Sequence, residues 1–109
     1  MKPWRLTRRA EDSLVEIFSW TLSRFGERQA IAFRDALIER IESIAAGQPP
    51  HPRPCGLLMR EHPGADDLVY YSEGGHYIVM RDSEEALIVL EFFHQATDLP
   101  RHLQALTGD

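Results

Sequence analysis

The chain has 109 residues, of which 43% are hydrophobic and 27% charged, a composition typical of one globular domain and not of a disordered segment. Its 12 basic and 17 acidic residues give a net charge of -5, which argues against a protein that coats nucleic acid through bulk electrostatics. Cys55 is the one cysteine, so no internal disulfide can form. We expect an ordinary side chain there, not a nucleophile or a metal ligand.

The N-terminal residues include basic side chains but no apolar segment behind them, so we expect no signal peptide. No run of residues approaches the roughly 18 apolar positions that a membrane-spanning helix needs. These two observations predict a soluble, cytoplasmic protein without a membrane partner.

A short strand is predicted first, at residues 3–7. Trp4 and Leu6 fall on one side of this segment and Arg5 on the other, which is the alternation of a half-buried strand. We therefore expect the fold to begin with a strand and not with a helix.

The next segment, from Arg8 to Phe25, predicts an amphipathic helix. Thr7 is a suitable N-cap, and Leu14 and Ile17 begin an apolar face at helical spacing. Gly26 supplies the residue type that commonly ends a helix, because glycine readily adopts a positive φ.

A second helix is predicted to start near Glu27 and to run for about 20 residues. Its apolar positions recur every three or four residues, and Gly47 with the prolines after it ends the pattern. Since the connection between the helices is so short, they form an antiparallel hairpin. The apolar seam of this second helix is formed by Ala30, Phe33, Leu37, Ile41 and Ile44.

The second half of the chain predicts strands. We expect them at residues 57–59, 68–72, 77–81 and 86–94, with Gly74-Gly75 at the centre of a tight β-hairpin turn. The last strand is apolar on both sides, which indicates a central strand covered on each face. Strict alternation would place Ile88, Leu90, Phe92 and His94 on one face and Leu87, Val89, Glu91 and Phe93 on the other.

Asp98 then caps a short C-terminal helix, with Pro100 at a tolerated early position. The predicted fold over residues 1–109 is one α+β domain. It consists of an N-terminal strand and a helix hairpin packed on a three- to four-stranded antiparallel sheet, followed by the short helix.

The best candidate for a functional cluster is formed by His94, Asp98, Arg101 and His102, with Arg81 on the neighbouring strand. A histidine at a strand end beside an arginine could act as a general acid or base on a phosphodiester. The alternative is that Asp98 is only a helix cap and fixes the ring of a partly buried His94. Glu84 and Glu85 would lie near the same region, which does not suit a ribonuclease.

A second candidate is the apolar surface of the first helix, formed by Phe18, Trp20, Leu22 and Phe25. Two helices on one sheet do not need all of this surface for their own core, so a partner could bind there. The alternative is fuller burial in the core of the protein itself.

Other side chains give weaker indications of a site. Tyr70, Tyr71 and Tyr77 could stack on bases, although cross-strand aromatic pairing is the simpler interpretation. His51 and His62 lack cysteines or carboxylates at ligand spacing, so we propose no metal site.

The order of elements and two segments resemble the ParE branch of the RelE/ParE toxin superfamily. The opening segment reads WRLTRRAEDSLVEIFSWTLSRFGERQAIAFRDALIERIESIAAGQP, and the closing one reads HYIVMRDSEEALIVLEFFHQATDLPRHL. The likeness covers nearly the whole chain, and it is carried by the order and spacing of these pieces.

The resemblance implies a type II toxin that inhibits DNA gyrase by binding, with no catalytic residue and no cofactor. It also implies a ParD-like antitoxin that wraps a C-terminal segment around the helix hairpin and the sheet, in a hetero-oligomer. Within it, Arg81, His94, Asp98 and Arg101 would contact the target, and Phe18, Trp20, Leu22 and Phe25 the antitoxin.

The chain departs from the family pattern near its end, where Glu91-Phe92-Phe93 and Gln95-Ala96-Thr97 replace basic residues that relatives often carry. Residues 61–67 also form a longer stretch than is usual in this branch. Two alternative functions therefore stay open. One is a RelE-like ribosome-dependent mRNA endoribonuclease, and the other is a non-toxic interaction module.

Overall fold

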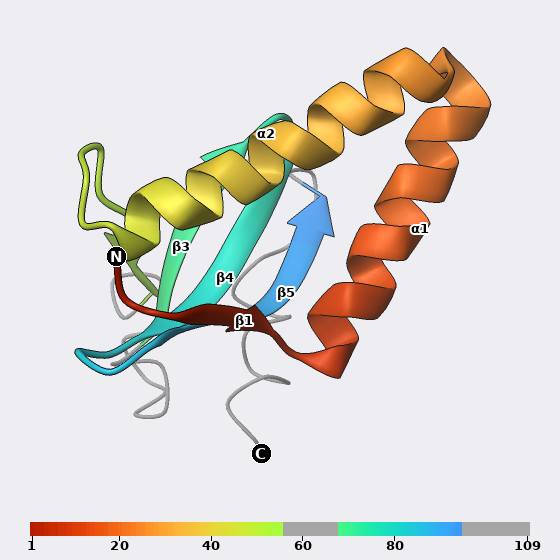
Figure 1. The fold of residues 1–109 in the computed structure, drawn as a ribbon. Helices are drawn as coiled ribbons and strands as arrows, with labels where there is room; N and C mark the ends of the chain where they lie inside the picture. The colour runs from red at the N-terminus through yellow and green to blue at the C-terminus, as the bar shows by residue number, and fades with distance from the viewer. Residues whose placement is uncertain (56–67, 95–109) are drawn as a thin grey trace.

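The computed structural model of the protein describes residues 1–55 and 68–94, and within these ranges two helices pack on a five-stranded sheet (Figure 1). The predicted α+β class is confirmed. The elements in chain order are β1 (Trp4–Leu6), α1 (Arg8–Phe25), α2 (Glu27–Ala45), β2 (Arg53–Pro54), β3 (Leu68–Glu73), β4 (His76–Asp82) and β5 (Leu87–His94).

The predicted helix hairpin is confirmed, both at the start of α1 and at the connection between the two helices. The Thr7 hydroxyl accepts a hydrogen bond from the backbone N–H of Ala10 at 3.1 Å, which caps the start of α1. Gly26 has a φ of 93° and ends α1 by donating its N–H to the Leu22 carbonyl at 3.0 Å. Glu27 then starts α2 at once, so the two helices diverge from Gly26 as a V (Figure 1).

The sheet differs from the prediction in its size and in the direction of one pair. Its strand order is β1-β5-β4-β3-β2, so the described residues contribute five strands and not three to four. β1 lies parallel to β5, with Trp4 opposite Leu87, whereas the other pairs are antiparallel. β2 was missed because it has only two residues, one of them Pro54, and proline is tolerated on an edge strand.

The turn between β3 and β4 is the predicted one. Gly74 and Gly75 have φ angles of 59° and 85°, and two consecutive positive values are those of a type I′ hairpin turn. The turn pairs Glu73 with His76 and fixes the register of the whole hairpin.

A β-bulge in β5 makes the predicted alternation of its side chains wrong after Val89. Val89 lies opposite Met80. Val79, the residue before Met80 in the antiparallel strand β4, lies opposite Glu91, so Leu90 is the extra residue in β5. Phe92 therefore packs with Val89 in the core beneath the helices and not on the face of Leu90. The Thr7 hydroxyl donates to the Leu90 carbonyl at 2.9 Å, which ties the start of α1 to the bulge.

The core has two parts, one on each face of the sheet. The larger lies between the sheet and the helices, where Leu37 and Ile41 of α2 pack on Ile78, Met80 and other residues of the strands. The smaller lies on the opposite face and contains Cys55, Leu68 and Val79. The central position that was predicted for β5 is confirmed, because β5 lies between β1 and β4.

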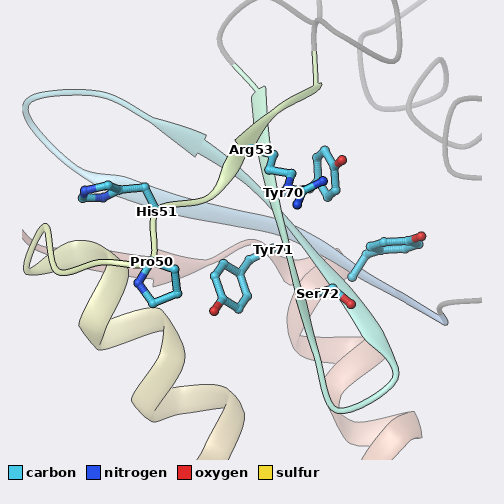
Figure 2. A pocket seen from close by; sticks show the side chains of 7 residues that line it. Pro50, His51, Arg53, Tyr70, Tyr71 and Ser72 are labelled. Atoms are coloured by element: carbon cyan, nitrogen blue, oxygen red, sulfur yellow. The ribbon is translucent and has the colours of Figure 1, made fainter.

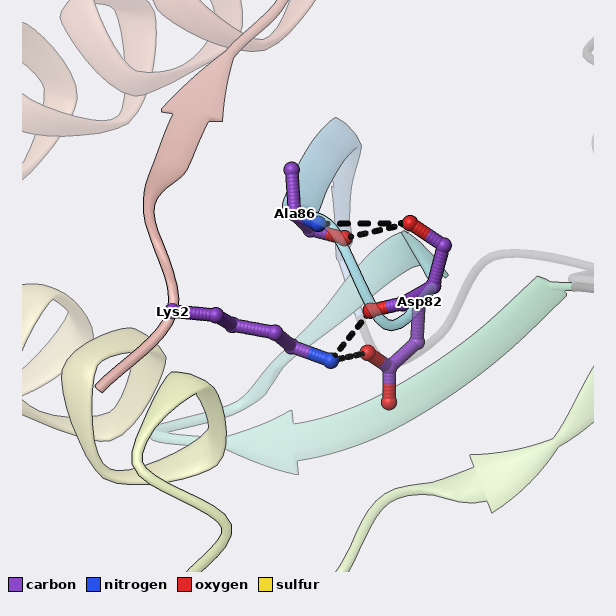
Figure 3. A network of polar contacts seen from close by, with 4 residues as sticks. Lys2, Asp82 and Ala86 are labelled. Carbon is purple, nitrogen blue, oxygen red and sulfur yellow. Dashed lines mark hydrogen bonds and ion pairs between the residues drawn. The ribbon is translucent and has the colours of Figure 1, made fainter.

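The loop between β4 and β5 is fastened to the N-terminal segment (Figure 3). The Lys2 ammonium donates to the Ser83 carbonyl at 2.7 Å and forms an ion pair with Asp82. Ser83 closes the loop through its side chain and backbone, both of which contact Ala86. These contacts hold β1 beside the start of β5.

Two predicted elements, the strand at residues 57–59 and the helix capped by Asp98, lie outside the described residues. Residues 61–67 lie outside them too. Neither described helix has a stretch both long and apolar enough to cross a membrane.

Burial makes Cys55 unreactive. Its side chain is fully buried, and this desolvation raises the pKa of the thiol to about 12, so the nucleophilic thiolate is scarce at neutral pH. We expect iodoacetamide at pH 7.5 to leave the native protein unmodified and to alkylate it fully in denaturant. Intact-protein mass spectrometry checks this, and rapid alkylation of the native protein would contradict the burial.

Candidate partner-binding groove

A hollow of about 450 Å³ opens between α1 and the turn that joins β3 to β4. It continues into a second hollow of about 200 Å³, and Trp20, Gly74 and His76 line both. We call the two together the α1 groove. Its other lining residues are Glu16, Ile17, Thr21, Phe25, Gln29, Phe33, Gly75 and His94.

The aromatic wall of the α1 groove is exposed. The side chains of Trp20 and Phe25 are 54% and 58% exposed, although they belong to the apolar residues of α1. Their rings meet edge to face with centroids 5.9 Å apart, and the Arg24 guanidinium lies 5.2 Å from the centre of the Trp20 ring. The pair is thus held in place while it stays open to a partner.

The four residues predicted as a single partner surface do not all lie in the groove. Trp20 and Phe25 line it, whereas Phe18 is half-buried, with the Arg34 guanidinium of α2 5.7 Å from its ring centre. Leu22, one helical turn after Phe18 and on the same side of α1, is 42% exposed. The apolar residues of α1 thus form a groove wall and a separate stripe.

The floor of the α1 groove is a pair of histidines from neighbouring strands. His76 and His94 lie opposite each other in β4 and β5, with ring centroids 5.4 Å apart. The His76 ring also meets Phe33 of α2 edge to face at 5.3 Å. Its Nδ1 atom is buried and makes no hydrogen bond within residues 1–55 and 68–94.

Burial lowers the pKa of His76, the nearby backbone of Gly74 acts in the opposite direction, and His94 lowers the pKa further. The sequence analysis missed His76. The register of the Gly74-Gly75 turn could have placed it at the start of β4, but the bulge decides that it meets His94.

The target cluster predicted from the sequence is not assembled in the described part of the chain. Arg81 lies opposite Ile88, whereas His94 lies opposite His76 at the other end of β4. Arg81 lies five positions after His76 in β4, which corresponds to about 16 Å along the strand. Asp98 and Arg101 lie outside the described residues, so the structure gives no position for them.

A second pocket of about 430 Å³ lies at the edge of the sheet, where β2 meets β3 (Figure 2). Tyr70 and Tyr77 pair across β3 and β4 with ring centroids 5.8 Å apart, which confirms the simpler interpretation of these two tyrosines. Figure 2 shows Tyr71 and Ser72 on opposite sides of β3. Tyr71 is not part of the pair of Tyr70 and Tyr77. Its ring packs against Arg40 of α2, whose guanidinium lies 4.7 Å from the centre of the Tyr71 ring.

An ion pair joins α2 to the end of β3. Arg40 donates from Nε to a carboxylate oxygen of Glu73 at 2.8 Å, and this hydrogen bond raises the pKa of Arg40. The contact stabilises the hairpin turn beside the α1 groove. Among the described residues, no three His, Cys, Asp or Glu side chains gather in a way that could hold a metal ion.

Comparison with known families identifies the fold. Residues 4–99 match the family described as the ParE toxin of the type II toxin–antitoxin system parDE. The chain belongs to the ParE toxin family. The resemblance seen in the sequence is thus confirmed, and the match spans both helices and all the described strands.

The ParE fold also appears in a solved structure titled "Chromosomal ParDE TA system from P. aeruginosa". The two chains share 18% sequence identity at a TM-score of 0.66, and the match covers 86% of this chain and 96% of that one. At this identity the likeness shows the fold alone. A search of curated protein sequences gives no significant match.

One residue at which this ParE chain departs from the family pattern has a structural explanation. Glu91 is 7% exposed and lies at the bulge of β5, where one carboxylate oxygen accepts the backbone N–H of Phe92 at 3.0 Å. The other oxygen lies 3.6 Å from Nε of Arg9 on α1. Glu91 therefore joins β5 to α1. The Phe92 N–H and the Arg9 guanidinium both face this buried carboxylate, as a buried charge requires.

Proposed function

We propose that this protein is the toxin of a pair in which a ParD-like antitoxin binds the α1 groove and the stripe of Phe18 and Leu22. The exposed pair of Trp20 and Phe25 carries the proposal. A large apolar side chain that is more than half exposed beside a groove is typical of a protein-binding surface. Membership of the ParE family gives the class of partner.

We propose further that the free toxin inhibits DNA gyrase by binding, without catalysis and without a cofactor. Arg81, His94, Asp98 and Arg101 remain our candidates for contact with the target. His94 lies at the end of β5 and also lines the α1 groove, so an antitoxin seated there would cover it. Neutralisation then needs no second mechanism, because the antitoxin and the target compete for His94.

The test is DNA supercoiling by purified gyrase in the presence of the protein freed from its antitoxin. We expect supercoiling to be lost and cleaved DNA to accumulate, and added antitoxin to restore the activity. Arg81→Gln and His94→Ala should each raise the half-inhibitory concentration by about tenfold, the effect of losing a contact of about 1.4 kcal/mol.

Arg5→Gln is the matched control, because Arg5 is an exposed arginine on the edge strand β1, away from the groove. It should leave inhibition unchanged. An unaffected gyrase together with codon-dependent cleavage of ribosome-bound mRNA would replace our proposal with the endoribonuclease.

A further inference from the structure

His76 and His94 lie side by side on the floor of the α1 groove. Resting on our proposal that the antitoxin binds this groove, we infer that an apolar antitoxin segment seated over the two rings keeps His76 uncharged, so that acidification weakens the complex. The pH would then regulate how much of the toxin has its α1 groove occupied.

The geometry makes a charge on this pair unfavourable once the groove is filled. The ring centroids are 5.4 Å apart, so protons on both rings would repel each other. His76 lies between His94 and Phe33, and its buried Nδ1 makes no hydrogen bond within the described residues. The Gly74 backbone favours a charge on the His76 ring, but burial outweighs it, and an apolar guest would also remove the remaining water.

Within residues 1–55 and 68–94, no neighbouring carboxylate offsets the effect of burial on the His76 ring. Glu73 of β3 lies opposite His76, but its carboxylate is engaged by Arg40 of α2 at 2.8 Å. α1 contributes Glu16, an exposed residue of the groove wall, and β5 contributes His94 itself. Burial still lowers the pKa of His76 in the free protein, despite these carboxylates.

The sign of the pH dependence follows from this. A guest that desolvates the His76 ring further lowers its affinity for protons, so the complex binds fewer protons than the free toxin. Affinity is then highest above about pH 6.5, the ordinary pKa of histidine, and falls as the pH drops below the lowered pKa of His76 in the free toxin. The loss is about tenfold for each pH unit and for each proton excluded.

The groove also selects the chemistry of the guest. Its walls are the apolar side chains of Ile17, Trp20, Phe25 and Phe33, and Glu16 at the rim would repel a carboxylate. The occupant is therefore an antitoxin segment that presents apolar side chains to the histidines and no acidic side chain. An acidic side chain would stabilise the protonated rings and reverse the pH dependence.

The experiment measures the dissociation constant of the toxin with the antitoxin encoded beside its gene, by titration calorimetry from pH 7.5 to 5.5. We expect binding to be about threefold or more weaker at pH 5.5, because the free toxin takes up a proton at His76 that the complex excludes. His76→Phe keeps an aromatic ring against Phe33 and cannot be protonated, so it should flatten this dependence. The antitoxin's own titrating groups cancel in the difference between the two toxins.

His51→Phe is the matched control, because His51 is exposed and lines the pocket at the sheet edge and not the α1 groove. It should retain the full pH dependence. If His76→Phe fails to fold, the imidazole proton resonances of the unmodified toxin replace it. Those of His76 should move toward their protonated positions as the pH falls to 5.5 in the free protein and stay at their neutral positions in the complex.

The possible outcomes separate the two proposals. A complex that forms at pH 7.5 with a flat or inverted pH dependence, or with a His76 imidazole that titrates as in the free toxin, overturns the inference alone. The absence of any complex at pH 7.5 overturns the proposed function, and the inference with it. The predicted difference between His76→Phe and His51→Phe supports both.

Discussion

Trp20→Ala and Phe25→Ala should each weaken antitoxin binding about 30-fold or more without unfolding the domain. Trp and other large aromatic side chains at the centre of an interface typically contribute about 2 kcal/mol or more to binding, which corresponds to that factor. Both side chains are more than half exposed in the free protein, and neither belongs to the buried core. Their removal should therefore change the free energy of unfolding by only about 0.5 kcal/mol.

Titration calorimetry at pH 7.5 measures the affinity, and urea unfolding measures the stability. Val15→Ala is the control, because Val15 is another exposed apolar residue of α1, at 64%, but does not line the groove. Its affinity should equal that of the unmodified toxin. If all three variants bind alike, the antitoxin does not use the groove.

Gly74→Ala should destabilise the protein by about 3 kcal/mol, far more than the same change at Gly75. Gly74 has a φ of 59°, and an L-residue in that conformation costs about 1–2 kcal/mol. A Cβ atom on Gly74 would also lie 2.5 Å from Cε2 of Phe33, so this ring, which now contacts His76, must shift. Overpacking of this kind adds about 1–3 kcal/mol.

Gly75→Ala separates these two causes. Its φ of 85° carries a similar conformational cost, but an added Cβ would meet no atom within 4 Å. We expect a loss of about 1 kcal/mol, from backbone strain alone. Chemical denaturation of both variants checks the difference, and equal losses would show that Phe33 moves aside without cost.

The helix hairpin could be predicted from the sequence because the signals that define it are local. Thr7 and Gly26 lie next to the ends that they determine, and the apolar period of each helix lies within the helix itself. The Gly74-Gly75 turn is local in the same way, since two adjacent glycines specify the hairpin and its register.

The parts that could not be predicted depend on contacts between distant segments. Whether β1 pairs parallel or antiparallel is decided by where its connection to β5 can run, and not by residues 4–6. The bulge at Leu90 cannot be recognised in the sequence, because the residues around it are nearly all apolar. It nevertheless decides which side chains pack with Phe92 in the core. The candidate site was predicted in part, because Trp20 and His94 line the groove while Arg81 lies away from His94.

The parallel pairing of β1 with β5 has a consequence for synthesis on the ribosome. β1 is synthesised before α1 and α2, but its neighbour in the sheet is β5, the last described strand, so the pair cannot form until β5 has been made. The helix pair can meanwhile form from local contacts. His94, which ends β5, arrives later still. The surface that we propose for the antitoxin is therefore finished only when translation of the domain is nearly over.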